Sequence, residues 1–175
     1  MDQRSRILDA VAELTTARGR LPSILEVAAE VGLTKQGVLH YFPSRAALDS
    51  AVIMRSVERI DRAMRVAADG APETSPTATY LRLSSPDDAD CATAAVVLAA
   101  GSPTSGGMPA EVGEAVRRWE ALIGLEVGDP VRAEVVRLTG DGLFAEALAS
   151  GVPPDAERVE RLVAHLLAPM TPAHR

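Results

Sequence analysis

The sequence predicts an all-α fold, because helical patterns recur along nearly its whole length. Apolar residues return at spacings of three and four in successive segments, and no segment alternates as a β-strand does. Most of these segments begin after Ser, Thr, Asp or Pro and end at Gly or Pro, which are the residues that start and stop helices. The 175 residues are 47% hydrophobic but only 3% aromatic, so we expect one or two domains with a core of Ala, Val and Leu.

Three helices are predicted near the N-terminus, over residues 3–18, 24–31 and 35–42. Ser23 and Glu26 form an S-x-x-E capping box at the start of the second helix, and Gly32 ends that helix with a left-handed turn. Thr34 can cap the third helix, and Pro43 stops it. A helix, a glycine turn and a second helix make the helix-turn-helix pattern, whose second helix enters the major groove of DNA.

The surface positions of the third helix carry side chains that suit contact with DNA. Lys bonds to a guanine edge or a phosphate, Gln pairs with adenine, and Thr and Tyr hydroxyls bond to phosphates. We therefore predict DNA contacts for Thr34, Lys35, Gln36, Gly37, His40 and Tyr41, and for Ser44 and Arg45 at the start of the next helix. Arg45 stands where the helix dipole disfavours a cation, which a phosphate contact would explain. The alternatives are a packed aromatic pair of His40 and Tyr41 beside Phe42, and simple solvent exposure of Arg45.

A long fourth helix is predicted from Arg45 to about Ala68, and residues 70–76 break the pattern after it. Further helices are predicted over residues 77–84, 86–101, 109–127, 129–149 and 155–167, which gives about nine in all. Gly140 and Gly142 interrupt the helix of residues 129–149, and we expect them to bend it or to admit another backbone.

Charge is divided unevenly along the chain. The formal net charge is −6, but residues 1–65 carry ten basic and eight acidic side chains, whereas residues 66–175 carry eight basic and sixteen acidic ones. The single lysine, Lys35, stands at the start of the third predicted helix. An acidic body with a mildly basic head favours directed contact with DNA over general coating of nucleic acid. A solvated acidic surface is the plainer explanation of the same asymmetry.

The sequence offers little that an enzyme or a membrane protein needs. It has no His/Cys cluster at metal-ligand spacing and no Gly-rich phosphate loop, so we expect no catalytic site, no cofactor and no metal site. The acidic pair Asp87 and Asp88 is explained as capping charge at a helix start. No apolar run is long enough to span a membrane, and residues 2–6 are too polar to begin an export signal. The single Cys91 fits a reducing compartment, so we expect a cytoplasmic protein.

The segment from Ile7 to Leu48 resembles the DNA-binding domain of the TetR (tetracycline-repressor) family of bacterial transcriptional regulators. In that family the turn has an I-A-x-x-A-G-V-S-like sequence, the recognition helix is Y-x-H-F-like, and the fourth helix begins P-S-K-x-x-L. The matching residues here are Val27-Ala28, Gly32-Leu33-Thr34, Phe42-Pro43-Ser44, Arg45 and Leu48. Two positions depart from the pattern, because Leu39 and Tyr41 stand where the family commonly has a DNA-facing Tyr and a His.

The resemblance implies a three-helix DNA-binding head over residues 1–48, linked by the long fourth helix to a helical ligand-binding and dimerisation domain over residues 49–175. It also implies a homodimer formed by the last two helices, residues 129–149 and 155–167. The D-G-L-F-A-E-A-L segment, residues 141–148, and the final helix look similar to the dimerising helices in one branch of the family. The partners implied are double-stranded operator DNA and a small molecule.

We expect that small molecule to be largely apolar. Met54, Tyr80, Trp119 and Phe144 are weak candidates for the wall of its pocket, and ordinary core packing would also explain each of them. The predicted function is that of a ligand-responsive regulator, most simply a homodimeric repressor that a small molecule releases from a palindromic operator. The alternative is a helical protein–protein interaction module without specific DNA binding.

Overall fold

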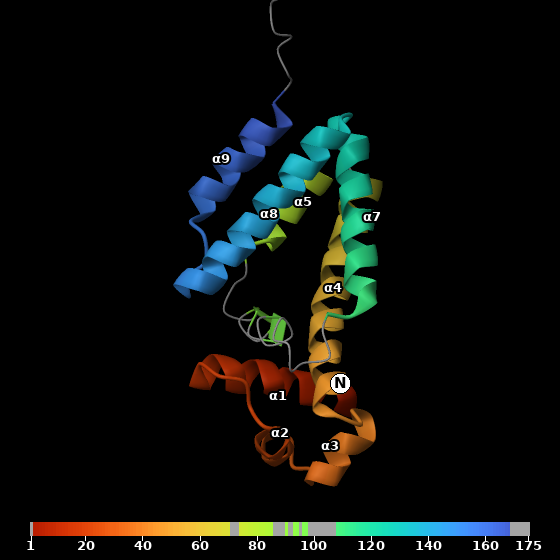
Figure 1. Cartoon of the computed structure of the whole chain (residues 1–175), viewed down its shortest axis with the longest axis vertical. Coiled ribbons are helices and arrows are strands. Elements are labelled where there is room, and N and C mark those ends of the chain that lie inside the picture. The colour runs from red at the N-terminus through yellow and green to blue at the C-terminus, as the bar shows by residue number, and fades with distance from the viewer. Residues whose placement is uncertain are drawn as a thin grey trace, which may run out of the picture. The chain divides into compact units, whose positions relative to one another are not determined.

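The computed structural model contains eight α-helices and no strand in the residues that it describes, which are 2–70, 74–85, 90, 93–94, 96–97 and 108–168 (Figure 1). The helices are α1 (Gln3–Arg18), α2 (Ile24–Glu30), α3 (Lys35–Tyr41), α4 (Arg45–Asp69), α5 (Pro76–Leu83), α7 (Ala110–Val127), α8 (Pro130–Ser150) and α9 (Ala156–Leu167). The predicted all-α fold is confirmed, and the number of helices is close to the nine expected. The helix predicted over residues 86–101 falls mostly outside the described residues, as does Cys91.

Capping side chains fix where the helices of the head begin. The Ser23 hydroxyl accepts a hydrogen bond from the Glu26 N–H at 3.3 Å, and the Glu26 carboxylate accepts one from the Ser23 N–H at 2.7 Å. This is the predicted capping box. Thr34 caps α3 by accepting a hydrogen bond from the Gly37 N–H at 3.1 Å, and Ser44 caps α4 in the same way. The sequence therefore determines the starts of α2, α3 and α4 locally.

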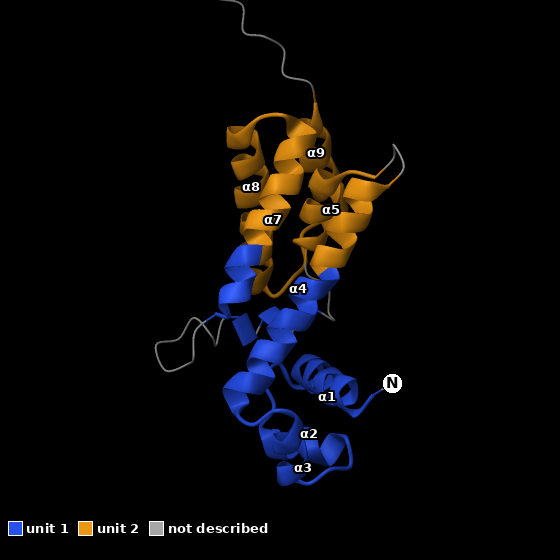
Figure 2. Ribbon diagram, turned by 90° about the vertical axis from the view of Figure 1, so that its right-hand side faces the viewer, with its two compact units in different colours: residues 1–59, 86–114 blue, residues 60–85, 115–175 orange. Residues whose placement is uncertain are grey.

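The chain forms two compact units (Figure 2). Unit 1 comprises residues 1–59 and 86–114, and unit 2 comprises residues 60–85 and 115–175. Helices α4 and α7 each contribute residues to both units, because the divisions fall within them. These units follow the packing of the chain, and the functional boundary expected between residues 48 and 49 stays a prediction.

Unit 1 contains the three-helix head, which packs around an aliphatic core. Ile7 and Val11 of α1, Val27 of α2, Val38 of α3 and Leu48 of α4 are each at most 1% exposed. Burying one such side chain contributes about 1.5–3 kcal/mol to stability. The core therefore fixes which side of α3 faces inward and leaves its other side to solvent.

In unit 2, α5 packs against α8 and α9, with Leu81 and Val136 fully buried. Helix α8 continues through its two central glycines without interruption. A Cβ on Gly140 would lie 2.5 Å from Tyr80 Cε1 and 2.6 Å from Ser84 Oγ, so only a glycine lets α5 approach this closely. Gly142 is exposed, and a Cβ there would meet nothing within 4 Å. Gly140 thus serves packing within the chain.

Neither a membrane span nor a metal centre occurs in the described part of the chain. None of its helices is both long and apolar enough to cross a bilayer. No three His, Cys, Asp or Glu side chains in these residues are grouped so that they could hold a metal ion. The candidate binding sites in the described residues are therefore exposed helix faces and pockets.

Candidate nucleic-acid interface

Helix α3 presents a polar face to solvent. Lys35 and Gln36 are exposed in its first turn, and His40 and Tyr41 are exposed in its last turn. Val38 lies on the opposite side and is 0% exposed. The helix has seven residues, so it is about 10 Å long and fits within the width of the major groove. Donors and acceptors along one short exposed helix are what the edges of bases and the phosphates require.

Gly37 is half-buried, and a side chain at this position would meet Leu33 and Thr34 of the preceding turn. A Cβ there would lie 3.3 Å from Leu33 Cβ and 3.5 Å from Thr34 Oγ1, which is tight. The glycine therefore lets the first turn of α3 pack closely against Leu33. A close approach of DNA at Gly37 stays a prediction, and internal packing is an additional reason for the missing side chain.

The three aromatic side chains at the end of α3 differ in their surroundings. His40 and Tyr41 meet edge to face with ring centres 5.4 Å apart, and both are exposed. Phe42 is 2% exposed, and the guanidinium of Arg4 lies 5.0 Å from its ring centre. Phe42 thus belongs to the core, whereas the His40–Tyr41 pair lies on the surface and is accessible to a partner.

Arg45 lies at the start of α4, and its guanidinium is engaged within the head. Its Nε donates to both carboxylate oxygens of Asp49, at 2.8 and 2.9 Å, and its Nη1 donates to the carbonyl oxygen of Pro22. The Arg45 side chain is half-buried as a result. Simple solvent exposure therefore does not describe it, and its contact with DNA stays a prediction.

A cluster of charges that the sequence reading missed lies at the junction of α1 and α2. Glu26 accepts hydrogen bonds from Arg20 at 2.6 and 3.2 Å and another from Arg18. The hydrogen bond from Arg20, followed by those from Ser23, holds the pKa of Glu26 well below its ordinary value of 4.5. Two basic residues just before an S-x-x-E box are the signal that would have revealed this cluster.

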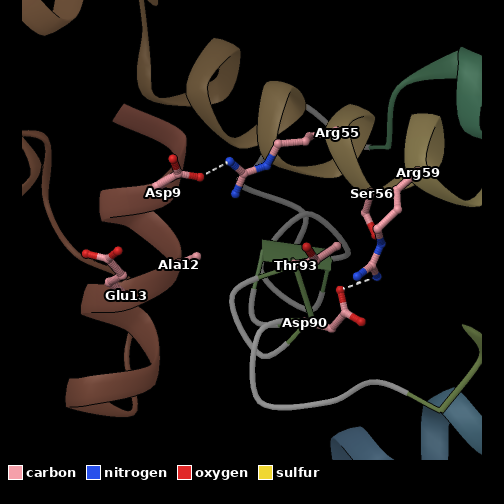
Figure 3. A pocket seen from close by; sticks show the side chains of 8 residues that line it. All are labelled: Asp9, Ala12, Glu13, Arg55, Ser56, Arg59, Asp90 and Thr93. Atoms are coloured by element: carbon pink, nitrogen blue, oxygen red, sulfur yellow. Dashed lines mark hydrogen bonds and ion pairs between the residues drawn. The ribbon is translucent and has the colours of Figure 1, made fainter. Parts of the chain in front are cut away.

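A polar pocket of about 350 Å³ lies in unit 1, between α1 and α4 (Figure 3). Arg55 donates to the Asp9 carboxylate at 2.6 Å and to the Leu8 carbonyl oxygen at 3.2 Å. Arg59, one turn further along α4, donates to the Asp90 carboxylate at 2.5 Å. Successive turns of α4 are therefore tied to α1 and to Asp90, so a shift of α4 would strain contacts of the head.

Trp119, one of the four candidates for the ligand pocket, is held in a buried polar cluster of unit 2. Its Nε1 donates to the Asp61 carboxylate at 2.6 Å, and Arg118 donates to the same carboxylate at 2.8 Å. Burial alone would raise the pKa of Asp61, but hydrogen bonds from Arg118, Trp119 and Arg65 outweigh it and lower this pKa. Asp61 therefore stays ionised and joins α4 to α7 within unit 2.

Tyr80 is also buried in unit 2, with its ring centre 6.1 Å from that of Trp119. Its hydroxyl donates to the Asp141 carboxylate at 3.0 Å. Burial and then the charge of Asp141 raise the pKa of Tyr80, so the phenol stays protonated. Tyr80 and Trp119 thus have structural roles whether or not they also meet a ligand.

The other two candidates for the ligand pocket are half-buried, Met54 in unit 1 and Phe144 in unit 2. A second pocket, of about 410 Å³, lies between α7 and α8 in unit 2. It is lined by Arg117, Glu120, Ala121, Gly124, Pro130 and Ala133. None of the four candidate residues lines this pocket or the pocket in unit 1. Their contact with a ligand stays a prediction.

Helix α8 has a second apolar face, which the described residues leave exposed. Val131, Val135 and Leu138 are 67%, 44% and 53% exposed, and their spacing places them in one stripe. The stripe continues over small exposed residues, Gly142, Ala145 and Ala149. Soluble monomers rarely expose a contiguous apolar stripe, which therefore indicates a surface for a partner.

Comparison with known proteins identifies the family to which this helical arrangement corresponds. Residues 74–171 match a family model described as "Tetracyclin repressor-like, C-terminal domain", and this range is more than half of the chain. No curated protein sequence matches the chain.

Several solved structures are similar over nearly the whole chain. One, described as "Molecular basis for control of antibiotic production by a bacterial hormones", has a TM-score of 0.69 and 23% identity, and covers 93% of this chain and 94% of its own. A member of the TetR family from Streptomyces coelicolor A3 has a TM-score of 0.67 and 21% identity, with 95% and 99% covered. The multidrug binding protein EbrR complexed with ethidium has a TM-score of 0.62 and 20% identity, with 95% and 99% covered.

At identities below 25%, these structures establish a shared fold and nothing further. The family model adds a match in sequence over most of the C-terminal part. The segment from Ile7 to Leu48, at the other end of the chain, resembles the DNA-binding domain of the TetR family. Both ends of the chain therefore indicate the same family. The chain belongs to the TetR (tetracycline-repressor) family of bacterial transcriptional regulators.

Proposed function

We propose that this protein is a homodimeric repressor that binds a palindromic operator and is released from it by a small molecule. The observation that carries the proposal is the outward polar face of α3, which Val38 and the Thr34 cap hold in place. In a dimer, two copies of α3 would enter successive major grooves, about 34 Å apart. A ligand would release the DNA by binding more tightly to a conformation in which that spacing is wrong.

The residues of α3 are proposed to divide between reading bases and contacting phosphates. Lys35 and Gln36 are the proposed base readers, for a guanine and an adenine edge, because both are exposed in the first turn. Thr34, His40, Tyr41 and Ser44 are the proposed phosphate contacts, and Gly37 is proposed to let the backbone come close. Loss of a base reader should relax sequence preference, whereas loss of a phosphate contact should weaken binding to all sequences.

The proposed dimer forms through α8 and α9. The exposed stripe of Val131, Val135 and Leu138 supports this proposal, because a second copy of the same stripe would remove it from water. Gly142 lies within the stripe and would let the two copies of α8 approach closely. Contact between two apolar helix faces is typical of stable homodimers.

The proposed ligand is a small, largely apolar molecule bound in the C-terminal domain. Ethidium, a planar aromatic cation present in one similar structure, is a suitable first probe. Because Trp119 is the single tryptophan, its fluorescence reports on its own surroundings. Quenching of Trp119 by ethidium that saturates, at an ethidium concentration that does not change when the protein is diluted, would support a pocket near Trp119. Quenching that rises linearly without saturation would contradict it.

The variant Lys35→Ala/Tyr41→Ala tests the recognition helix. The probe is a duplex that the wild-type protein selects from a random-sequence library. We expect the double variant to lose at least about tenfold in affinity in a gel-shift assay at moderate salt, because each well-placed base contact contributes about 1–3 kcal/mol. Light scattering should show the dimer intact. Unchanged retention by the variant would contradict the assignment, and failure of the wild type to select any sequence would favour the protein–protein interaction module.

A further inference from the structure

Arg45 makes two hydrogen-bonded connections at once, in different directions. Its Nε bonds to both oxygens of the Asp49 carboxylate, one turn further along α4. Its Nη1 bonds to the carbonyl oxygen of Pro22, which lies 23 residues earlier, between α1 and α2. Pro22 is itself buried, so this carbonyl belongs to a fixed part of the head. The guanidinium therefore links the start of α4 to the residue that precedes the cap of α2.

This double connection requires an arginine. A guanidinium is planar and donates from several nitrogens in fixed directions, whereas the ammonium group of lysine is a compact point charge. The carboxylate of Asp49 also offsets the unfavourable position of a cation in the first turn of a helix. With Asp49 orienting its Nε, the Nη1 of Arg45 is directed at the Pro22 carbonyl oxygen.

The segment between the two ends of this link contains α2, the turn and α3. The link thus closes the helix-turn-helix into a loop whose ends cannot separate while Arg45 keeps both partners. Helix α3 is short, with seven residues, and its exposed face has no packing partner of its own in the head. Its orientation therefore depends on Val38 and on the fixed positions of the chain before α2 and after Pro43.

We infer that Arg45 is a positioning residue for the recognition helix, oriented by Asp49, and that it acts through Pro22 rather than through a DNA phosphate. This inference rests on the proposed DNA-binding function. It makes the arginine, and not merely a positive charge, a determinant of how well the protein distinguishes its operator from other DNA. A lysine here would keep the charge and lose the link.

The test compares affinity for the selected duplex with affinity for an unrelated duplex of equal length. Arg45→Lys keeps the charge, and we expect it to lower the ratio of the two affinities by about tenfold, which corresponds to one charged hydrogen bond. The slope of log affinity against log salt should remain that of the wild type, because no ion pair with DNA is lost. Asp49→Asn should also lower the ratio of the two affinities. The double variant Arg45→Lys/Asp49→Asn should lower this ratio no further than Arg45→Lys alone does.

Arg62→Lys is the matched control, because Arg62 is exposed on the same helix beyond unit 1. Thermal melts of all variants show whether the fold is retained, and Asp49→Asn provides an independent variant if Arg45→Lys melts early. An Arg45→Lys protein with the wild-type ratio would overturn the inference. So would an Arg45→Gln protein that loses affinity equally for both duplexes with a salt slope lower by about one per protomer, because that is the behaviour of a phosphate contact. Failure of the wild type to select any duplex would instead count against the proposed function.

Discussion

Helices α3 and α8 each bury one face and expose the other, but their exposed faces have opposite chemistry. Helix α3 exposes Lys35, Gln36 and His40, whereas α8 exposes a stripe of Val and Leu side chains. A polar exposed face is ordinary for a helix, and α3 stands out through its caps, its length and its place after a glycine turn. An apolar exposed face is unusual in itself. The contrast is consistent with the two proposals, that α3 meets a partner rich in hydrogen-bonding groups and that α8 meets another apolar helix.

A charged side chain placed in the exposed stripe of α8 should have the largest effect on operator affinity. Leu138→Arg places a cation where the proposed dimer would bury it, so we expect a monomer and a loss in operator affinity of about 100-fold, because the two half-sites are then bound separately. Sedimentation and gel-shift assays measure the two effects. Val66→Arg is the control, since Val66 is 62% exposed outside the stripe. A Leu138→Arg protein that remains dimeric would remove α8 from the interface.

Loss of Lys35 should have the next largest effect, on the other exposed face. Lys35→Ala should lower operator affinity by about tenfold and relax the preference for the selected duplex over an unrelated duplex, because a base contact is lost. Arg62→Ala removes the same charge from α4 and serves as the control. An equal effect of both variants would mean that net charge, and not the face of α3, governs binding.

The two glycines of α8 lie on different sides of the helix, because Gly140 is buried and Gly142 is exposed. Gly140→Ala should destabilise the protein by about 1–3 kcal/mol, because its Cβ would overlap Tyr80 and Ser84. Gly142→Ala, made in the monomeric Leu138→Arg background, should instead stabilise it by about 0.5–1 kcal/mol, because alanine is the better helix former and no atom of the same chain lies within 4 Å of the added Cβ. Urea denaturation measures both. Effects of the same sign would contradict the assignment of Gly140 to the inner side.

The smallest expected effect is on the stability contributed by Glu26, at the junction of α1 and α2. Because the pKa of Glu26 is lower in the folded protein than its ordinary value of 4.5, its contribution to stability is complete above that value and is lost as the pH falls below it. Glu26→Gln should therefore lower the melting temperature at pH 7, and its difference from the wild type should shrink as the pH falls from 5 to 3. A difference that does not change over this range would show that Arg18 and Arg20 contribute nothing through Glu26.

The local features of the head could be predicted from the sequence. The S-x-x-E box at Ser23, the left-handed turn at Gly32 and the caps at Thr34 and Ser44 all involve residues within four positions of each other. Such short-range bonds leave a pattern in the sequence, because the same residue types make them in any protein. The exposure of the outer face of α3 followed from them and from helical spacing.

Contacts between distant residues could not be predicted in this way. Nothing near Arg45 in the sequence indicates that its partner is a backbone carbonyl 23 residues earlier, because every residue has one. The carboxylate of Asp61 meets Trp119 only after the chain has folded. Gly140 and Gly142 were expected to bend α8 or to admit another backbone, but Gly140 makes room for the side chains of Tyr80 and Ser84 of this chain. Packing between distant segments determined each of these outcomes.

The most direct test of the central claim, that α3 reads operator DNA as part of a dimer, is hydroxyl-radical footprinting on the DNA next to the gene for this protein. For the wild type we expect two protected windows separated by about one helical turn, and for Lys35→Ala/Tyr41→Ala we expect both to disappear at the same protein concentration. Protection that persists in the double variant, or no protected window with the wild-type protein, would contradict the claim.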